Sequence, residues 1–358
     1  MHKIIFVVVY IISFAGTADS QNKTVSAETL QYPDEKHFKN LRQLTFGGDN
    51  AEAYFSNDGT YLTFQKTNPK EGIACDQIWM GKVPESADEP FVPKLVSTGT
   101  GRTTCAYFYP DGKHILYAST HLDSKDCPAV PDKAKRYIWP VYASFDLFKA
   151  DTSGRIIKRL TKTKGYDAEA TISPKGNKIL FTSLRNGDLD LYTMDLNGKH
   201  VKQITNTLGY DGGGWFSPDG KKIVWRASRP KTPEEIADYK DLLSKNLVAP
   251  ASMEVWIANA DGTDAHQITF LGKANWAPNF LPDGKHIIFC SNHEYKRGFP
   301  FNMYITDING KGLEKISRDK GFDAFPMFSR DGKKIVFSSN RNNGGTHDTN
   351  IFIADWVY

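Results

Sequence analysis

The chain has 358 residues and a formal net charge of +4, with basic and acidic side chains scattered along its whole length. The lack of a clustered Lys and Arg face in the sequence argues against a nucleic-acid-binding protein. Chains of this length often form two domains, but closed all-β folds of similar size form single units. Length and composition therefore leave the architecture open.

The first 20 residues have the pattern of an export signal. Lys3 supplies a positive start, an apolar run covers residues 4–14, and small residues precede Gln21. The apolar run is shorter than the roughly 20 residues that a membrane-spanning helix needs. We therefore predict a cleaved signal over residues 1–20 and no transmembrane segment in the mature chain. The same pattern predicts a periplasmic or secreted location, and residues 21–38 are expected to form an N-terminal extension.

One sequence unit recurs six times in the rest of the chain. Its core is an aromatic or apolar residue, a short turn that ends in Gly, and a β-branched or aromatic run. An apolar strand end, a turn with a residue that tolerates positive φ, and a second buried strand describe a β-hairpin. The turn glycines, 44 to 64 residues apart, are Gly59, Gly112, Gly176, Gly220, Gly284 and Gly332.

Each unit has room for two further strands, as in residues 191–195 and 202–205, which flank a turn at Asn197 and Gly198. Four antiparallel strands repeated six times predict a β-propeller. The sixth unit stops after its third strand, at residues 352–356, and a matching strand over residues 42–45 precedes the first unit. We therefore predict an all-β, six-bladed β-propeller over residues 39–358, closed by an N-terminal strand that completes the last blade.

These six units resemble the repeats of TolB-type propellers. That family includes the periplasmic TolB protein and the propeller domains fused to some secreted peptidases. The resemblance covers about residues 39–358 and implies a propeller that recognises a protein or peptide of the cell envelope. TolB carries a separate N-terminal domain, whereas only residues 21–38 precede the propeller here.

Four cysteines allow three disulfide pairings, and the export signal is compatible with oxidation. Cys290 lies in an apolar run and is predicted to be a buried free thiol. For the others, we consider a Cys105–Cys127 or a Cys75–Cys105 bridge.

The loops between blades, and those between second and third strands, share one face of a propeller, here called the upper face. The Asp-Gly turns lie on the opposite, lower face. Three units carry an Asp and, 18 residues later, an Arg, and the other units carry neither. We interpret this covariation as an ion pair within each blade, in preference to an acidic ring that binds a cation. The predicted pairs are Asp167–Arg185, Asp211–Arg229 and Asp323–Arg341.

Four other residues are candidates for binding. Glu52 and Glu169 occupy equivalent positions on the innermost strands, where they are predicted to line the channel and hold a cation or a peptide amine. Solvated carboxylates at a rim are the alternative. His121 and His293 replace the Arg of their units, but no third His falls at this repeat position, so we predict no metal site.

Two insertions, residues 119–145 and 228–252, fall between the second and third strands of their units. The second contains a predicted helix with Thr232 as N-cap. Aromatic and Arg-rich loops on a rigid scaffold predict a binding surface on the upper face, and packing of the insertions onto the propeller is the alternative. The candidate contact residues are Tyr137, Trp139, Arg297 and Phe299.

No nucleophile elbow, phosphate-binding glycine loop or Cys-x-x-Cys pair occurs in the sequence. We therefore predict no catalytic residues and no cofactor. The leading hypothesis is a binding module for an envelope protein or peptide. The alternatives are a carbohydrate-active enzyme, of the metal-assisted polysaccharide lyase type, and an accessory subunit of an envelope machine.

Overall fold

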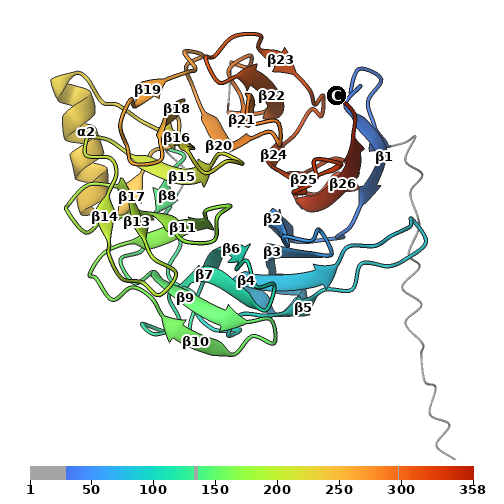
Figure 1. The fold of residues 1–358 in the computed structure, drawn as a ribbon, viewed down its shortest axis with the longest axis horizontal. Coiled ribbons are helices and arrows are strands. Elements are labelled where there is room, and N and C mark those ends of the chain that lie inside the picture. Colours follow the sequence, from blue (N-terminus) through green and yellow to red (C-terminus); the bar gives the residue numbers. More distant parts are fainter. Residues whose placement is uncertain (1–29, 133–135, 297) are drawn as a thin grey trace, which may run out of the picture.

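The computed structural model describes residues 30–132, 136–296 and 298–358. In it, six four-stranded antiparallel sheets surround a central axis, so the predicted propeller is confirmed (Figure 1). The innermost strands contact one another in sequence, and the last of them, β24, contacts the first, β2, which closes the ring.

The blades follow the chain in order. Blade one contains β2 (Asp49–Phe55), β3 (Tyr61–Asn68), β4 (Ile73–Lys82) and β5 (Lys94–Leu95), with the 3-10 turn η1 (Pro69–Glu71). Blade two contains β6 (Thr103–Phe108), β7 (His114–Ser119), β9 (Asp146–Asp151) and β10 (Ile156–Arg159). Blade three contains β11 (Asp167–Ile172), β12 (Ile179–Ser183), β13 (Asp190–Met194) and β14 (Lys202–Gln203).

The second half repeats this order. Blade four contains β15 (Asp211–Phe216), β16 (Lys222–Ala227), β18 (Glu254–Asn259) and β19 (His266–Gln267). Blade five contains β20 (Asn275–Phe280), β21 (His286–Ser291), β22 (Asn302–Asp307) and β23 (Glu314–Lys315). Blade six contains β24 (Asp323–Phe328), β25 (Lys334–Ser339), β26 (Asn350–Trp356) and β1 (Phe38–Gln43).

The recurring motif forms the predicted hairpin turn, as blade four illustrates. The Ser217 hydroxyl donates to Asp219 Oδ1 at 2.6 Å, and the Lys222 N–H donates to Ser217 Oγ at 2.9 Å. Gly220 has a φ of 70°, a conformation that glycine adopts without a steric penalty. The turn is therefore held by its own side chains and leaves both strands free to enter the blade.

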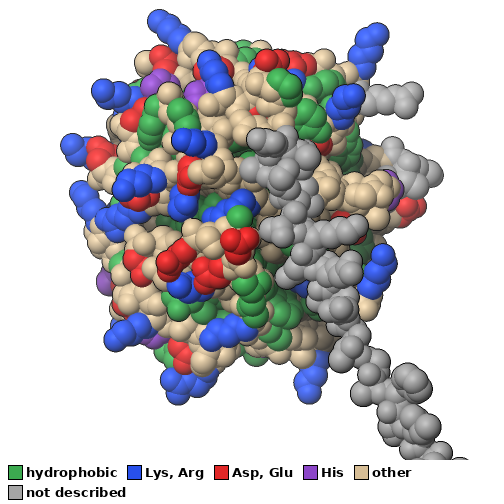
Figure 2. All heavy atoms as spheres, turned by 90° about the vertical axis from the view of Figure 1, so that its right-hand side faces the viewer, with side chains coloured by type: hydrophobic (Ala, Val, Ile, Leu, Met, Phe, Trp, Pro, Cys, Tyr) green, Lys and Arg blue, Asp and Glu red, His purple; other side chains and the backbone are tan. Residues whose placement is uncertain are grey.

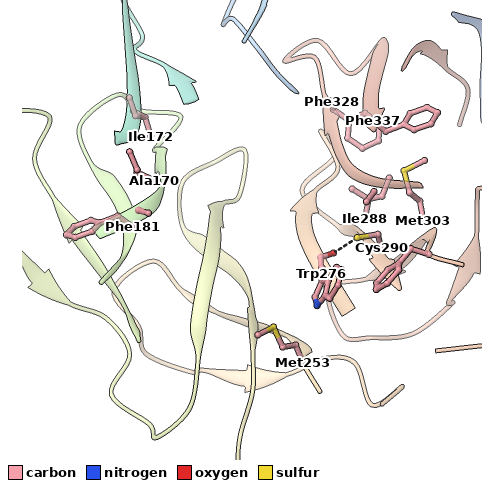
Figure 3. Close-up of a cluster of buried hydrophobic side chains, with 14 of the residues drawn as sticks. Ala170, Ile172, Phe181, Met253, Trp276, Ile288, Cys290, Met303, Phe328 and Phe337 are labelled. Atoms are coloured by element: carbon pink, nitrogen blue, oxygen red, sulfur yellow. Dashed lines mark hydrogen bonds between the residues drawn. The ribbon is translucent and has the colours of Figure 1, made fainter. Parts of the chain in front are cut away.

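The apolar core lies between neighbouring blades. Every residue of β12 and β13 is buried, because these middle strands have a blade against both of their faces. In Figure 3, Ile288 and Met303 of blade five and Phe328 of blade six belong to one buried cluster. Such packing makes the blades a rigid frame for the loops and the channel.

The N-terminal strand completes blade six. β1 pairs antiparallel with β26, from Phe38 opposite Trp356 to Gln43 opposite Phe352. The strand begins earlier than the predicted residues 42–45, because Phe38 and Leu41 are themselves buried. Beyond its end, the Leu44 N–H still donates to Ile351 O at 2.8 Å.

The segment before β1 is anchored on the same blade, which the sequence did not predict. Glu35 has no exposed surface, and its two carboxylate oxygens each accept a 3.0 Å hydrogen bond from the guanidinium of Arg341. Tyr32 donates its hydroxyl hydrogen to Asp319 at 2.7 Å. Residues 30–37 therefore continue the structure of blade six.

The disulfide joins Cys75 of β4 to Cys127 of the first insertion. Both bridges considered from the sequence are therefore wrong, because each used Cys105, which lies on the innermost strand β6 and is a buried free thiol. The prediction for Cys290 is confirmed, since it is buried and free.

The two insertions form one unit, although more than 80 residues separate them in sequence. β8 (Trp139–Pro140) of the first pairs with β17 (Leu247–Val248) of the second. Arg136 makes two 2.7 Å hydrogen bonds to Asp238, which lies on α2 (Pro233–Ser244). α2 begins with the predicted Thr232 cap, reinforced by Glu235 as a capping box. In the described part of the chain, no helix is long and apolar enough to cross a membrane.

Charged side chains are mixed on the surface. On the side of the molecule shown in Figure 2, Lys and Arg project at many points, with Asp and Glu between them. This face carries no continuous basic patch, in agreement with the scattered charges of the sequence.

Candidate functional site

One residue from each innermost strand bulges toward the central axis. Each has a φ between 48° and 62°, and each lies where the pairing of the first two strands of its blade shifts register. Five of the six are not glycine, and side chains in this conformation are rare and strained. They all line one cavity of about 40 Å³ on the axis. They are Glu52, Cys105, Glu169, Gly213, Ala277 and Phe325.

Glu169 is the most heavily bonded residue of this ring. Its carboxylate accepts hydrogen bonds from the Tyr210 hydroxyl at 2.8 Å, the Thr182 hydroxyl at 2.7 Å and the Gly213 N–H at 3.0 Å. It also forms an ion pair with Arg226. Burial lowers the pKa of Arg226, but the combined electrostatic effects of Glu169, Tyr210 and Glu52 outweigh it, and the net pKa lies above the usual value. Arg226 therefore remains a cation.

Arg226 reaches the channel because β15 has three successive glycines. A Cβ atom on Gly213 would collide with the Arg226 guanidinium, and one on Gly212 would collide with Glu169. A Cβ on Gly214 would lie 2.7 Å from Leu180 of blade three. The glycines thus open a passage from the second strand of blade four to the axis. Three glycines inside a strand are the sequence signal that could have revealed Arg226.

Glu52 lies in the same cavity but has weaker partners. One of its oxygens accepts the Tyr54 hydroxyl hydrogen at 3.0 Å and the Cys105 thiol hydrogen at 2.9 Å. Burial raises the pKa of Glu52 and raises that of Cys105 well above its usual value. The cavity therefore brings together the two predicted channel carboxylates, a neutral thiol and a cation. A cation or peptide amine as its occupant remains a prediction.

Three aromatic rings cross the channel below this cavity. Tyr54 contacts Trp215 with ring centroids 5.3 Å apart, and Tyr107 contacts Trp215 at 5.4 Å. Tyr54 and Tyr107 are 6.1 Å apart. A second cavity, of about 220 Å³, lies on the lower-face side of these rings.

The first insertion covers the upper end of the channel. The Trp139 ring lies 5.3 Å from the guanidinium carbon of Arg226 and 4.8 Å from the Trp276 ring. Tyr137 stacks on Trp276 at 6.1 Å and is 46% exposed. Trp139 therefore packs the first insertion onto the propeller. This was the alternative to a role of Trp139 in a binding surface.

The third aromatic segment lies in blade five. Phe299 is 60% exposed and contacts Phe301 and Phe322. Arg297, the remaining predicted contact residue, lies outside the described residues.

His121 and His293 lie in blades two and five, which are opposite each other in the ring of six. In each residue, the ring Nδ1 forms a hydrogen bond with the hydroxyl of the Ser two residues earlier. The Nδ1–Oγ distance is 2.8 Å for His121 and 2.9 Å for His293. Each ring also contacts an aromatic ring, and burial lowers the pKa of both side chains. The structure does not bring them together. In the ranges that it describes, no group of three His, Cys, Asp or Glu could hold a metal ion.

The three Asp–Arg pairs form within their blades. The nitrogen–oxygen distances are 2.9 Å for Asp167–Arg185, 2.6 Å for Asp211–Arg229 and 3.0 Å for Asp323–Arg341. All three carboxylates are buried. These contacts tie the start of each first strand to the loop after the second strand, which is a structural role.

The free energy of unfolding should depend on pH through Asp211. Burial raises its pKa to about 6, although Arg229 opposes the shift. A carboxyl group whose pKa is raised on folding stabilises the fold at low pH, and this contribution is lost as pH rises through the folded-state value. Relative to Asp211→Asn, the parent should lose up to about 3 kcal/mol between pH 4 and 7 in urea titrations.

A control for this titration is Asp219→Asn. Hydrogen bonding to Ser217 lowers the pKa of Asp219, so its stabilising contribution is nearly complete by pH 4, and the difference between the parent and this variant should stay nearly constant from pH 4 to 7. A constant difference between the parent and Asp211→Asn across this pH range would contradict the buried, perturbed carboxyl.

A closed ring of six four-stranded blades around an axial channel defines a β-propeller, and known proteins with this fold resemble the chain. The family described as the TolB beta propeller domain matches residues 142–245. A putative TolB from Agrobacterium tumefaciens is similar at a TM-score of 0.55 and 16% identity, covering 87% of this chain and 91% of that one. The chain is therefore a six-bladed β-propeller that shares its fold with these TolB structures.

Two other solved structures have the same fold. TolB from Acinetobacter baumannii is similar at a TM-score of 0.55 and 20% identity, covering 84% of this chain and 64% of that one. An oligogalacturonate lyase in complex with manganese is similar at a TM-score of 0.50 and 14% identity, covering 91% of this chain and 95% of that one. No curated protein matches the sequence.

The manganese of that lyase structure raises the question of a metal here. Imidazole nitrogens are common ligands for such ions, but His121 and His293 lie in opposite blades. In the axial cavity, the carboxylate of Glu169 already forms an ion pair with Arg226. These residues do not fit a metal-assisted lyase site.

Proposed function

We propose that the protein is an exported binding module that recognises a protein or peptide of the cell envelope through its upper face. The observation that carries this proposal is the exposure of large aromatic side chains on separate upper-face loops. Phe270, between β19 and β20, is 78% exposed, and Phe299, between β21 and β22, is 60% exposed. Phe46, between β1 and β2, is 56% exposed.

Ordering the side chains of a contact surface costs conformational entropy on binding. Rigid aromatic side chains provide large apolar area and lose little conformational freedom on binding, so they are frequent anchors of protein interfaces. Here the loops of Phe270 and Phe299 each adjoin a largely buried strand, β20 and β21 respectively. A partner would therefore meet anchors whose positions are fixed before it binds.

Three features support an envelope location. Residues 1–20 have the order of a signal sequence, and the similarity to TolB proteins agrees with export. The Cys75–Cys127 disulfide suits an oxidising compartment, because cytosolic thiols are kept reduced.

The test is retention of a partner by variants of the upper face. We expect the wild-type protein, immobilised and exposed to a detergent extract of the native envelope, to retain a discrete partner. Phe270→Ala combined with Phe299→Ala should weaken that binding at least 30-fold, because anchor residues contribute about 2 kcal/mol or more. The melting temperature should not change, since both side chains are exposed.

The matched control removes exposed apolar side chains from the lower face. Val92, in the β4–β5 turn, is 74% exposed, and Leu313, in the β22–β23 turn, is 42% exposed. The double variant Val92→Ala/Leu313→Ala should retain the partner. If the control loses the partner and the upper-face variant keeps it, the proposed face is wrong.

A further inference from the structure

The larger axial cavity opens at the lower face, among the turns of the repeated motif. Its volume is about 220 Å³, and its lining comes from all six blades. An engineered protein cavity of about 150 Å³ holds benzene, so this one has room for a phenyl ring with a short polar substituent. The cavity is therefore large enough for a small apolar group and too small for a folded partner.

The inner wall of this cavity is aromatic and apolar. Tyr107 and Trp215 meet there edge to face, with an angle of 75° between their planes. Met327 lies beside them and accepts a 2.7 Å hydrogen bond from the Asn279 amide. Ligand pockets generally combine such walls with a few polar groups that fix the orientation of the ligand.

One charged residue stands at the rim. The third position of the motif is Pro in four blades and Asn57 in blade one, but in blade six it is Arg330. Arg330 is exposed and lines the cavity. Among residues 30–132, 136–296 and 298–358, its guanidinium has no hydrogen-bond or ion-pair partner. It differs in this from Arg226 and Arg341, which are held by carboxylates.

A second donor faces the same space. The Tyr107 hydroxyl makes no hydrogen bond within those ranges. Burial raises the pKa of Tyr107 to about 12, although the nearby Arg330 charge opposes the shift. The hydroxyl is therefore protonated at neutral pH and available to donate. A cation and a neutral donor at the edge of an aromatic cavity are complementary to an anion that carries an apolar group.

We propose that this cavity binds a carboxylate attached to an aromatic or branched apolar group. The apolar group enters between Trp215 and Met327, and the carboxylate pairs with Arg330. Such a group is offered by a free aromatic acid and by the C-terminal residue of a peptide that ends in Phe or Leu. The site lies on the face opposite the proposed partner-binding surface, so either proposal can fail without the other.

The first experiment is calorimetric titration of the full chain with 3-phenylpropionate. We expect saturable binding at one site per chain. Arg330→Gln should weaken it about 10- to 100-fold, the effect of losing a hydrogen bond to a charged group. Lys333→Gln removes the same charge from the same turn outside the cavity lining, and it should bind within about twofold of wild type.

A second measurement needs no variant. The neutral isostere 3-phenylpropionamide should bind the wild-type protein as weakly as the acid binds Arg330→Gln. A tetrapeptide ending in Phe with a free carboxylate then distinguishes the source. Binding tighter than that of 3-phenylpropionate indicates a chain terminus, and equal or weaker binding indicates a free acid.

Three results would overturn the proposal. These are the lack of saturable binding by both the acid and the peptide at millimolar concentration, equal affinity for the acid and its amide, and equal losses in Arg330→Gln and Lys333→Gln.

Discussion

Replacing Arg226 by Met should lower the free energy of unfolding by about 3–5 kcal/mol, because it leaves the carboxylate of Glu169 buried without its cation. The ion pair is almost wholly enclosed, with each side chain 11% exposed. Hydrogen bonds from Tyr210 and Gly213 would remain, but they are neutral donors and cannot replace the charge. Urea denaturation measures the loss.

The double variant Arg226→Met/Glu169→Gln should recover part of this loss, since neither charge is then left alone. A loss equal to the sum of the two single variants would mean that the residues do not interact. Arg155→Met provides the control, because Arg155 pairs with Asp151 in an exposed turn and is itself 76% exposed. That change should have little effect on unfolding.

Removing β1 should prevent the propeller from folding as a soluble monomer. A chain that starts at Phe46 lacks the buried side chains of Phe38 and Leu41, whose burial contributes about 3–6 kcal/mol together. This approaches the whole stability of a typical domain, about 5–15 kcal/mol. The deletion also exposes the edge of β26, where another chain can add a strand. Size-exclusion chromatography and thermal unfolding measure the outcome.

Two longer chains serve as controls for this truncation. The chain that starts at Leu30 keeps β1 and the Glu35 anchor and is the reference. The chain that starts at Phe38 keeps β1 but removes Glu35, so it should fold with a lower melting temperature. Closure by β1 would be contradicted by a Phe46 chain that is monomeric and melts with the reference.

The fold was predictable from sequence because each blade repeats the same local signals. The turn around Asp219 and Gly220 carries its own hydrogen bonds, and it recurs with little change in the other units. The Asp–Arg spacing was informative for the same reason, since Asp211 and Arg229 covary across six internal copies. Internal repeats can be compared with one another within one sequence, which is not possible in a chain without repeats.

The channel chemistry was only partly predictable, because it depends on departures from the repeat. Arg226 lies in an ordinary buried strand, and its direction follows from the missing side chain of Gly213. Glu35 belongs to a segment without a repeated counterpart. Cys127 lies in an insertion whose path over blade one is set by tertiary contacts, so spacing could not select its partner Cys75.

The pairing of the two chain ends also sets the order in which the molecule can be completed. Glu35 is among the first described residues to leave the ribosome, yet its partner Arg341 is made 306 residues later. Throughout synthesis the first strand has no blade to join, and the ring stays open. A product truncated before β25 would lack both Arg341 and the strand that receives β1. β1 can therefore take its place in blade six only after β26 has been synthesised.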